Sequence, residues 1–380
     1  MTPAPHVMIS AGEASGDLHA AEVVRALGQR LPGLRCSGLG GPAMAGAGVE
    51  LVHRMEDLAV MGFSEVLSKL GVIWSRLKSL KRHMAEQRPD LLILVDFPDF
   101  NLRLARAANR LGIPVLYFIG PQVWAWRAKR ARKVQALVNR LAVVFAFEVD
   151  VWYHLAPDLK VRFVGHPVVD ELPERYDQGP PLPIPEAAEV VGILPGSRGG
   201  EIRRMLPMLL QAASLIHGRR PGLHFVLPVA PGLDRGELEP YLEHAPPGLT
   251  IVKGQAGRVM RRARLLLAAS GTVTLEAALV GTPMVVVYRT GWFNYLVAKS
   301  LVKLDYISLP NLVAGRQVVP ELIQGRATPE AVAAEGMALL ESEENYQRAV
   351  DDLAEVRRLV GGPGAGDRVA EMAQELMGEA

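Results

Sequence analysis

The sequence has almost no cysteine, because Cys36 is the only one among 380 residues. A single thiol excludes a disulfide framework and a zinc site built from several thiolates. An excess of one charge is also missing, since 42 Lys and Arg stand against 40 Asp and Glu, a formal net charge of +2. This small surplus gives no reason to expect a nucleic-acid partner.

Long uninterrupted apolar runs are absent as well. The most apolar long stretch, Leu265 to Tyr288, contains Glu276 and Pro283, so we expect no transmembrane helix. The first apolar run begins at His6 without a basic segment before it, and we therefore expect no signal peptide and a cytoplasmic location. With 49% hydrophobic and 22% charged residues, the chain can still bury a large core.

Short apolar runs alternate with helical patterns along the chain. Continuous apolar strands between helices are typical of parallel sheets that are covered by helices on both faces. A chain of this length is too long for one core, so we expect an α/β protein with two doubly wound domains. The predicted strands are His6–Ile9, Leu91–Val95, Val115–Ile119, Leu141–Phe145, Val161–Val164, Val190–Leu194, Leu223–Pro228, Leu265–Ala268 and Met284–Tyr288.

A proline-rich stretch predicts the domain boundary. Residues 173–188 contain five prolines, which interrupt both helices and strand ladders. We expect an N-terminal domain over 1–172, a linker over 173–188, a C-terminal domain over 189–340 and C-terminal helices over 341–380. A glycine-rich hinge precedes the last helix, which is expected to pack on the first domain or on a second subunit.

Two predicted strand ends in the first half carry candidate ligand-binding residues. Asp96 follows the strand Leu91–Val95, at the edge where open α/β sheets place their ligands. Asp99 or Asn101 is expected to cap the next helix. The turn after the first strand offers two glycines, an acid and a hydroxyl to an anion, although a structural turn is an equally good interpretation: Gly12, Glu13, Ser15 and Gly16.

A third strand end leads into a run of positive charge. Gln122 and two tryptophans are followed by five cations in the seven positions 127–133, beginning with Arg127. A solvated helix face is the ordinary interpretation of such a run, but the tryptophans favour a phosphate or headgroup site. Residues 1–172 carry 21 basic and 16 acidic residues, so the first domain is the better candidate for an anionic partner.

The second half has two loops of a nucleotide-binding kind and a third, which ends at Asn311 and by itself is merely a turn. Arg198 could bind a diphosphate with its forked guanidinium, and Glu276 could accept hydrogen bonds from ribose hydroxyls. A solvent-exposed Glu276 remains the alternative. Hydroxyls and backbone N–H groups at a helix start could hold phosphate oxygens. The candidates are Gly196, Ser197, Arg198, Ser270, Gly271, Thr272, Glu276 and Asn311.

The helix predicted over 64–86 has an apolar stripe that is typical of a core-facing side. Beside this stripe lie Leu67, Trp74, Lys78 and Lys81, and no acidic residue occurs from 66 through 85. These four residues could enter a lipid interface, or they could widen the core face with lysines that reach back to solvent. The histidines have no metal-ligand spacing, so we expect no metal.

Six sequence blocks together resemble one enzyme family. From near Val7 to about Glu321 the chain resembles lipid-A-disaccharide synthase, with one departure at Phe145-Ala146-Phe147-Glu148, where the family usually has proline before Phe-Glu. The blocks are Ala11-Gly12-Glu13-Ala14-Ser15-Gly16-Asp17, Val60-Met61-Gly62-Phe63-Ser64-Glu65-Val66, Asp96-Phe97-Pro98-Asp99-Phe100-Asn101, Pro121-Gln122-Val123-Trp124-Ala125-Trp126, Leu194-Pro195-Gly196-Ser197-Arg198 and Tyr306-Ile307-Ser308-Leu309-Pro310-Asn311.

The resemblance implies a GT-B glycosyltransferase with two Rossmann-like domains facing a cleft and a C-terminal helical tail. It implies UDP-2,3-diacylglucosamine as donor, 2,3-diacylglucosamine 1-phosphate as acceptor, no cofactor, and a β-1,6-linked disaccharide 1-phosphate and UDP as products. Asp96 would be the general base, and Gly12, Glu13, Ser15, Gly16, Gln122 and Arg127 would lie on the acceptor side. The cytoplasmic surface of the inner membrane is the expected partner, and a homodimer remains an option.

Two other functions share these features. A UDP-N-acetylglucosamine 2-epimerase or another GT-B enzyme would have the same donor loops but no use for an apolar and basic surface. A lipid or nucleotide-sugar carrier would bind the same ligands without turnover.

Overall fold

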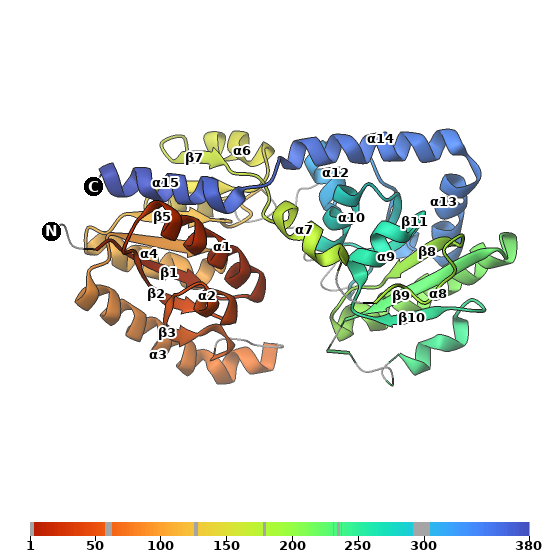
Figure 1. The fold of residues 1–380 in the computed structure, drawn as a ribbon, viewed down its shortest axis with the longest axis horizontal. Helices are drawn as coiled ribbons and strands as arrows, with labels where there is room; N and C mark the ends of the chain where they lie inside the picture. The colour runs from red at the N-terminus through yellow and green to blue at the C-terminus, as the bar shows by residue number, and fades with distance from the viewer. Residues whose placement is uncertain are drawn as a thin grey trace. The chain divides into compact units, whose positions relative to one another are not determined.

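The computed structural model describes residues 4–57, 63–124, 128–177, 180–230, 232, 233, 236, 238–291 and 305–379; the side chains of 63–70, 173–175 and 177 lie outside this description. The chain folds into two compact units (Figure 1). The N-terminal unit comprises Met1–Pro167 and Gly361–Ala380, and the C-terminal unit comprises Val168–Val360.

The N-terminal unit is built on a seven-stranded sheet in the order β3-β2-β1-β4-β5-β6-β7. Every neighbouring pair is parallel, which confirms the predicted α/β class. The two central strands are fully buried, and one of them, Leu91–Val95, is apolar throughout. The strands are β1 His6–Ala11, β2 Arg35–Gly40, β3 Glu50–Arg54, β4 Leu91–Val95, β5 Val115–Phe118, β6 Arg140–Val143 and β7 Lys160–Phe163.

Helices cover the N-terminal sheet. The described side chains of α3 confirm its predicted core face, because Leu77, Leu80 and Met84 are buried in the unit's hydrophobic core. No helix in the described ranges is long and apolar enough to cross a bilayer. The helices are α1 Ala14–Arg30, α2 Pro42–Gly46, α3 Phe63–Gln87, α4 Pro98–Arg110, α5 Arg130–Gln135, α6 Phe147–Leu155 and α15 Ala365–Glu379, with a 3-10 turn η1 at Met55–Asp57.

The C-terminal unit has a six-stranded sheet in the order β10-β9-β8-β11-β12-β13, again all parallel. Its strands are β8 Glu189–Leu194, β9 Leu223–Val229, β10 Thr250–Lys253, β11 Leu265–Ala269, β12 Met284–Tyr288 and β13 Glu321–Ile323. Its helices are α7 Val168–Asp177, α8 Gly199–Arg219, η3 Glu239–His244, α9 Ala256–Arg262, α10 Thr272–Val280, α12 Leu309–Ala314, η4 Gln324–Arg326, α13 Pro329–Glu341 and α14 Glu343–Val360.

The first boundary between the units lies earlier in the chain than the expected one at residue 172, and the second lies later than the expected one at residue 340. The first division falls at Pro167, because α7 contacts α9 and α10 and so belongs to the C-terminal unit. Pro173 lies at the sixth position of α7, where its missing N–H removes a single helical hydrogen bond. The second division falls at Val360, so α13 and α14 stay in the C-terminal unit and α15 alone returns.

Helix α15, blue in Figure 1, packs on α1 and on β4, β5 and β6 of the N-terminal unit. Charged side chains hold it there: Arg140 pairs with Glu375 and Glu379, and Arg162 also lies 3.0 Å from Glu375. Arg368 adds a 2.7 Å hydrogen bond from Nε to the carbonyl oxygen of Val164. The end of the chain therefore completes the unit that its beginning starts.

The strand order of each sheet fixes where loops can gather. In the N-terminal sheet the order reverses between β1 and β4, where Ala11 pairs with Val95. In the C-terminal sheet it reverses between β8 and β11, where Leu194 pairs with Ala268. Open α/β sheets bind ligands at the carboxyl ends of the strands that flank such a reversal. The loops that follow β1 and β4 are therefore the candidate site of the N-terminal unit, and those that follow β8 and β11 are the candidate site of the C-terminal unit.

Candidate active site

Asp96 follows β4 with an unusual backbone. Its φ is 47°, and the φ of Phe97 is 48°, so two consecutive residues with side chains adopt the left-handed conformation. This conformation costs roughly 1–2 kcal/mol for each such residue, and strain of this kind collects at functional sites. The surrounding structure must therefore hold the turn in place.

A buried asparagine supplies that restraint. The Asn101 amide nitrogen donates to the carbonyl oxygen of Asp96 at 2.8 Å and, at 3.2 Å each, to those of Val95 and Ser10. The Ser10 hydroxyl donates to Asn101 Oδ1 at 2.7 Å, and the Tyr117 hydroxyl donates to the Asp96 carbonyl oxygen at 2.8 Å. One amide thus ties the ends of β1 and β4 to the first turn of α4.

The predicted helix cap is wrong. Helix α4 begins at Pro98, and no side chain caps it. Asn101 is fully buried and turned towards the strand ends, while Asp99 pairs with Arg130 at 2.6 Å. The Asn101 amide bonds to the strained turn and not to the helix start. Pro98 at the helix start has no N–H group that would require a capping bond.

The carboxyl group of Asp96 has a raised pKa. Burial raises its pKa to about 6, the nearby Glu13 carboxylate adds to the increase, and a hydrogen bond from the Phe97 backbone and the charge of His19 act against it. A pKa close to neutral suits a general base, because such a group is ionised and still accepts protons readily. Asp96 therefore has the electrostatic setting of a proton-transfer group.

The loop after β1 lies against this carboxylate. A Cβ atom at Gly12 would come within 2.3 Å of the Phe97 ring, so only glycine lets the two loops approach. Glu13 and Ser15 are exposed, and Gly16 is buried at the start of α1. Glu13 makes no side-chain capping bond to α1.

The carboxylate of Asp17 binds the backbone at the start of α2. It accepts hydrogen bonds from the backbone of Gly41, Ala43 and Met44 at 2.7, 2.9 and 3.1 Å. Asp17 is therefore a structural residue that joins α1 to the start of α2, as the alternative reading of this turn allowed.

A hollow of about 280 Å³ opens beside Asp96. Gln122 and Arg130 come to it from the segment after β5, so the structure brings together two of the predicted strand ends. Arg130 was not singled out from the run of cations by its sequence. Arg127 lies outside the described residues. The hollow is lined by Asp96, Pro98, Ile119, Gly120, Pro121, Gln122 and Arg130.

Glu148 joins the loop that contains Trp124 to the segment between β6 and α6. Its buried carboxylate accepts a hydrogen bond from Trp124 Nε1 at 2.9 Å and from the backbone of Val144 and Phe145 at 3.2 and 3.1 Å. Burial raises the pKa of Glu148 against the effect of these bonds. The sequence indicated this residue only as part of the block Phe145-Ala146-Phe147-Glu148, and gave it no role.

The first loop of the C-terminal unit presents a cation to solvent. Gly196 has a φ of 100°, and a Cβ there would lie 2.5 Å from Glu201 Oε2. That oxygen accepts from the backbone N–H groups of Ser197 and Arg198 at 3.3 and 3.4 Å. The Arg198 side chain is 84% exposed. Glu201 thus occupies these two backbone donors and also lies 3.4 Å from the Arg198 guanidinium, and this exposed guanidinium is the group of the loop that would attract an anion.

The loop after β11 lies beside the segment that precedes α12. The Ser270 hydroxyl donates to the carbonyl oxygen of Ile307 at 3.2 Å. Gly271 and Thr272 are exposed at the start of α10, and Glu276 is half-buried one turn further along. The strand order therefore brings this helix start and the Arg198 loop to the same edge of one sheet.

Asn311 does not have the role expected of it. Its amide donates to Val319 O and Glu321 Oε1 at 2.9 and 2.7 Å and accepts from the backbone of Val318 and Val319 at 2.7 and 2.9 Å. All four hydrogen-bonding positions of the amide are then filled. Asn311 is thus a structural residue in this unit, and Glu321, which sequence reasoning missed, also binds the Ile307 and Ser308 backbone.

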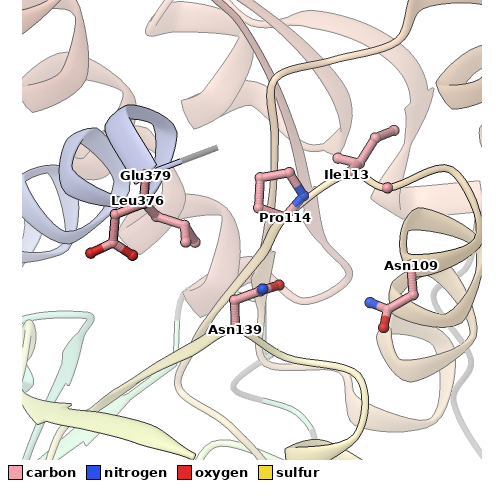
Figure 2. Close-up of a pocket in the computed structure, with 7 residues that line it drawn as sticks. Asn109, Ile113, Pro114, Asn139, Leu376 and Glu379 are labelled. Carbon is pink, nitrogen blue, oxygen red and sulfur yellow. The ribbon is translucent and has the colours of Figure 1, made fainter.

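A larger hollow, of about 400 Å³, lies elsewhere in the N-terminal unit (Figure 2). Pro114 and Asn139, which precede β5 and β6, and Leu376 and Glu379 of α15 line it. It is at the amino ends of the strands, opposite to Asp96, so size alone does not locate the chemistry. Within the described ranges, no group of three or more His, Cys, Asp or Glu side chains is placed to hold a metal ion.

The sequence is similar to one family of known proteins over nearly its whole length. Residues 7–371 match the model of the lipid-A-disaccharide synthetase family. The lipid-A-disaccharide synthase of Geobacter metallireducens is 42% identical over 99% of this chain and 98% of the relative. That of Anaeromyxobacter dehalogenans strain 2CP-1 is 44% identical over 96% of both chains.

Solved structures share the fold at low sequence identity. The UDP-GlcNAc 2-epimerase of Neisseria meningitidis, bound to UDP-GlcNAc, has a TM-score of 0.65 at 14% identity, covering 99% of this chain and 100% of the other. MurG of Acinetobacter baumannii has a TM-score of 0.61 at 19% identity, covering 98% and 99%. The calicheamicin glycosyltransferase CalG4 has a TM-score of 0.63 at 16% identity over both full chains. At these identities the likeness establishes the GT-B fold alone.

The pH dependence of turnover should reveal the interaction between Glu13 and Asp96. Asp96 can act as a general base only while it is ionised, so a rate that depends on it should fall as the pH drops through its pKa of about 6. Replacing Glu13 by Gln removes a neighbouring negative charge that raises this pKa, and the acidic limb should move to lower pH. Initial rates measured across the limb test this expectation. Glu22→Gln, an exposed change on α1, is the control, and a limb that stays in place in Glu13→Gln would contradict it.

Proposed function

The chain belongs to the lipid-A-disaccharide synthetase family, and we propose that Asp96 is the general base of its glycosyl transfer. The protein is a glycosyltransferase of lipid A biosynthesis with the GT-B fold, and it joins a nucleotide sugar to a lipid sugar. The observation that carries the assignment of Asp96 is its strained, network-held position at the carboxyl end of β4, together with its pKa of about 6.

In the proposed reaction, the Asp96 carboxylate takes the proton of the 6-hydroxyl of 2,3-diacylglucosamine 1-phosphate. The hydroxyl oxygen forms a bond to the anomeric carbon of UDP-2,3-diacylglucosamine as the bond from that carbon to the diphosphate breaks. The anomeric carbon is inverted, and UDP leaves with the electron pair of the broken bond. A positioned base typically contributes about 10²–10⁴-fold to such a rate.

The residues at the carboxyl edge of the C-terminal sheet fit a UDP-sugar donor. Arg198 and the start of α8 would stabilise the negative charge that develops on the diphosphate. Ser270, Gly271 and Thr272 at the start of α10 would add hydroxyl and backbone donors. Glu276 would accept from the ribose hydroxyls. Asn311 would act indirectly, since its bonds to Glu321 and to residues 318 and 319 fix the segment beside Ser270.

The acceptor side is assigned to the carboxyl edge of the N-terminal sheet. Gly12, Glu13, Ser15 and Gly16 form the loop next to Asp96, and Gln122 lines the hollow beside it. Polar groups around a hollow are the usual setting of a sugar-binding site.

The exposed face of α3 is proposed to lie on an anionic membrane. Trp74 is 52% exposed, Lys78 is exposed and Lys81 is half-buried, and the Arg103 guanidinium lies 4.6 Å from the Trp74 ring centre. An exposed aromatic ring beside several cations is typical of proteins that bind the interface without crossing it. The structure does not describe the side chain of Leu67, the fourth residue of the predicted patch.

The two alternative functions are set aside by family membership. Curated relatives that span nearly the whole chain at 42–44% identity bear the name of the synthase, whereas the likeness to an epimerase is at 14% identity. Mass spectrometry of the product formed from the two acylated sugars tests the proposed reaction. A tetraacyl disaccharide 1-phosphate and an equal amount of UDP are expected, and an epimerised nucleotide sugar as product would contradict it.

Asp96→Asn should abolish turnover and leave the affinity for UDP within a few-fold. The carboxamide keeps the shape of the side chain but cannot accept the proton. Steady-state kinetics and calorimetry with UDP measure the two effects. The loss should be at least about 10²-fold, and a variant that kept more than a tenth of the activity would show that Asp96 is not the base.

Arg198→Ala and Glu276→Ala should both weaken UDP binding, by about 10- to 150-fold, since each loses a charge-assisted hydrogen bond of roughly 1.5–3 kcal/mol. The two variants should differ with uridine, which lacks the diphosphate. Arg198→Ala should bind uridine as well as the wild type does, whereas Glu276→Ala should lose affinity for both ligands. Calorimetry that gave equal losses for both ligands in both variants would contradict these placements.

Trp74→Ser combined with Lys78→Glu should abolish sedimentation with vesicles that contain phosphatidylglycerol. The change removes an apolar anchor and reverses a cation, and each cation near an anionic surface contributes about 1 kcal/mol. Tyr153→Ser combined with Arg25→Glu, another exposed aromatic and another exposed cation of the same unit, is the matched control and should still sediment. Equal sedimentation of both folded double variants would rule out this face.

A further inference from the structure

We propose that Arg130 binds the 1-phosphate of the acceptor sugar beside Asp96 and thereby selects a phosphorylated acceptor. The proposal rests on the proposed function, because it takes Asp96 as the base that activates the same sugar. Arg130 would be the specificity-determining cation of the acceptor site.

The position of Arg130 carries the proposal. It begins α5, its side chain is only 12% exposed, and it lines the hollow of about 280 Å³ together with Asp96 and Gln122. Carbon 1 and carbon 5, which carries carbon 6, both adjoin the ring oxygen of a pyranose, so the 1-phosphate and the 6-hydroxyl lie within the width of one sugar, and a cation and a base that line the same hollow can reach both. In the described part of the chain, Arg130 is the one cation that lines this hollow.

The size of the hollow limits what can enter it. Pockets that enclose whole drug-sized ligands have volumes of about 300–1,000 Å³, and this hollow is slightly below that range. It can hold a sugar and its phosphate but not two acyl chains as well, so the chains must stay outside. Recognition inside the hollow would then depend on the headgroup, whose strongest feature is the phosphate.

Asp99 pairs with the Arg130 guanidinium at the solvent-exposed surface. The two side chains lie 2.6 Å apart, and the Asp99 side chain is 78% exposed. A guanidinium has five N–H donors in a planar fork, which matches a phosphate with two parallel hydrogen bonds. Asp99 orients Arg130, and a phosphate that entered the hollow would bind the guanidinium in place of, or beside, its present partners.

Other positively charged side chains lie near Arg130. The pKa of Lys133 is lowered by burial and then by the charges of Arg106, Arg130 and Arg103, while the charge of Asp99 acts against this, so these groups lie around Lys133. Arg103 stacks on Trp74, which belongs to the proposed membrane face. The single carboxylate of Asp99 offsets only part of this positive charge, and an acidic lipid sugar would offset more of it.

Two acceptors that differ only in the 1-phosphate test the proposal. With 2,3-diacylglucosamine 1-phosphate, Arg130→Gln should raise the KM and the Kd by about 10-fold or more, the usual effect of losing a charge-assisted hydrogen bond. With 2,3-diacylglucosamine, the same variant should differ from the wild type by less than about 3-fold. Arg130→Lys keeps the charge without the fork and should fall between the two.

Equilibrium binding of each acceptor by calorimetry, without donor, provides the readout even where turnover is too slow to measure. Arg25→Gln, which removes an exposed arginine of α1 paired with Glu22, is the control for the loss of one positive charge. It should bind both acceptors as the wild type does. Thermal unfolding confirms that each variant is folded, and Arg130→Lys provides a second variant if Arg130→Gln is not.

Three results would overturn the proposal. Equal losses with both acceptors would make Arg130 a support for the Asp96 loop, an equal loss of UDP affinity would place it at the donor, and unchanged binding of the phosphorylated acceptor would remove it from the site. The proposed function fails on different evidence, namely an Asp96→Asn variant that stays active or a wild-type protein that forms no disaccharide.

Discussion

The N-terminal active-site edge depends on one buried amide. Asn101 bonds to the carbonyl oxygens of Ser10, Val95 and Asp96, so it joins the two strands on either side of the sheet reversal. Without these bonds, a left-handed backbone at two consecutive residues that are not glycine would be strained, above all at Phe97, since aspartate adopts this conformation more readily than most residues with side chains. The direction of the Asp96 carboxylate, its approach to Glu13 and the wall of the adjacent hollow all follow from this turn.

The C-terminal unit solves a similar problem with the same residue type. Asn311, like Asn101, is a fully buried residue near the start of a helix that contains a proline in its first turn. The Asn101 amide bonds to backbone carbonyl oxygens, and the Asn311 amide bonds to a backbone carbonyl oxygen and to the Glu321 carboxylate. In both units a short polar side chain satisfies backbone groups that a loop at a sheet edge would otherwise bury unpaired. The exposed residues, such as Arg198 and Thr272, are then left to meet a ligand.

The sequence predicted those parts of the fold that are formed by continuous apolar segments. The central strands were found because they are continuous apolar runs, while β2 and β10, which mix polar residues into short segments, gave no such signal. Asn101 was mistaken for a cap because an asparagine near a helix start has the same sequence signature whether it faces the helix or the sheet. Arg130 could not be separated from the neighbouring cations, because a charge run does not reveal which side chain folds back towards a hollow.

Three acids near the carboxyl edge of the N-terminal sheet show why burial alone does not identify a base. Asp17 and Glu148 are more buried than Asp96, but the carboxylate of each accepts three hydrogen bonds that join separate segments. At Asp96 the bonds from Asn101 and Tyr117 go to the backbone carbonyl oxygen instead. The fold thereby fixes the position of Asp96 through its main chain, and the side chain keeps the capacity to take up a proton.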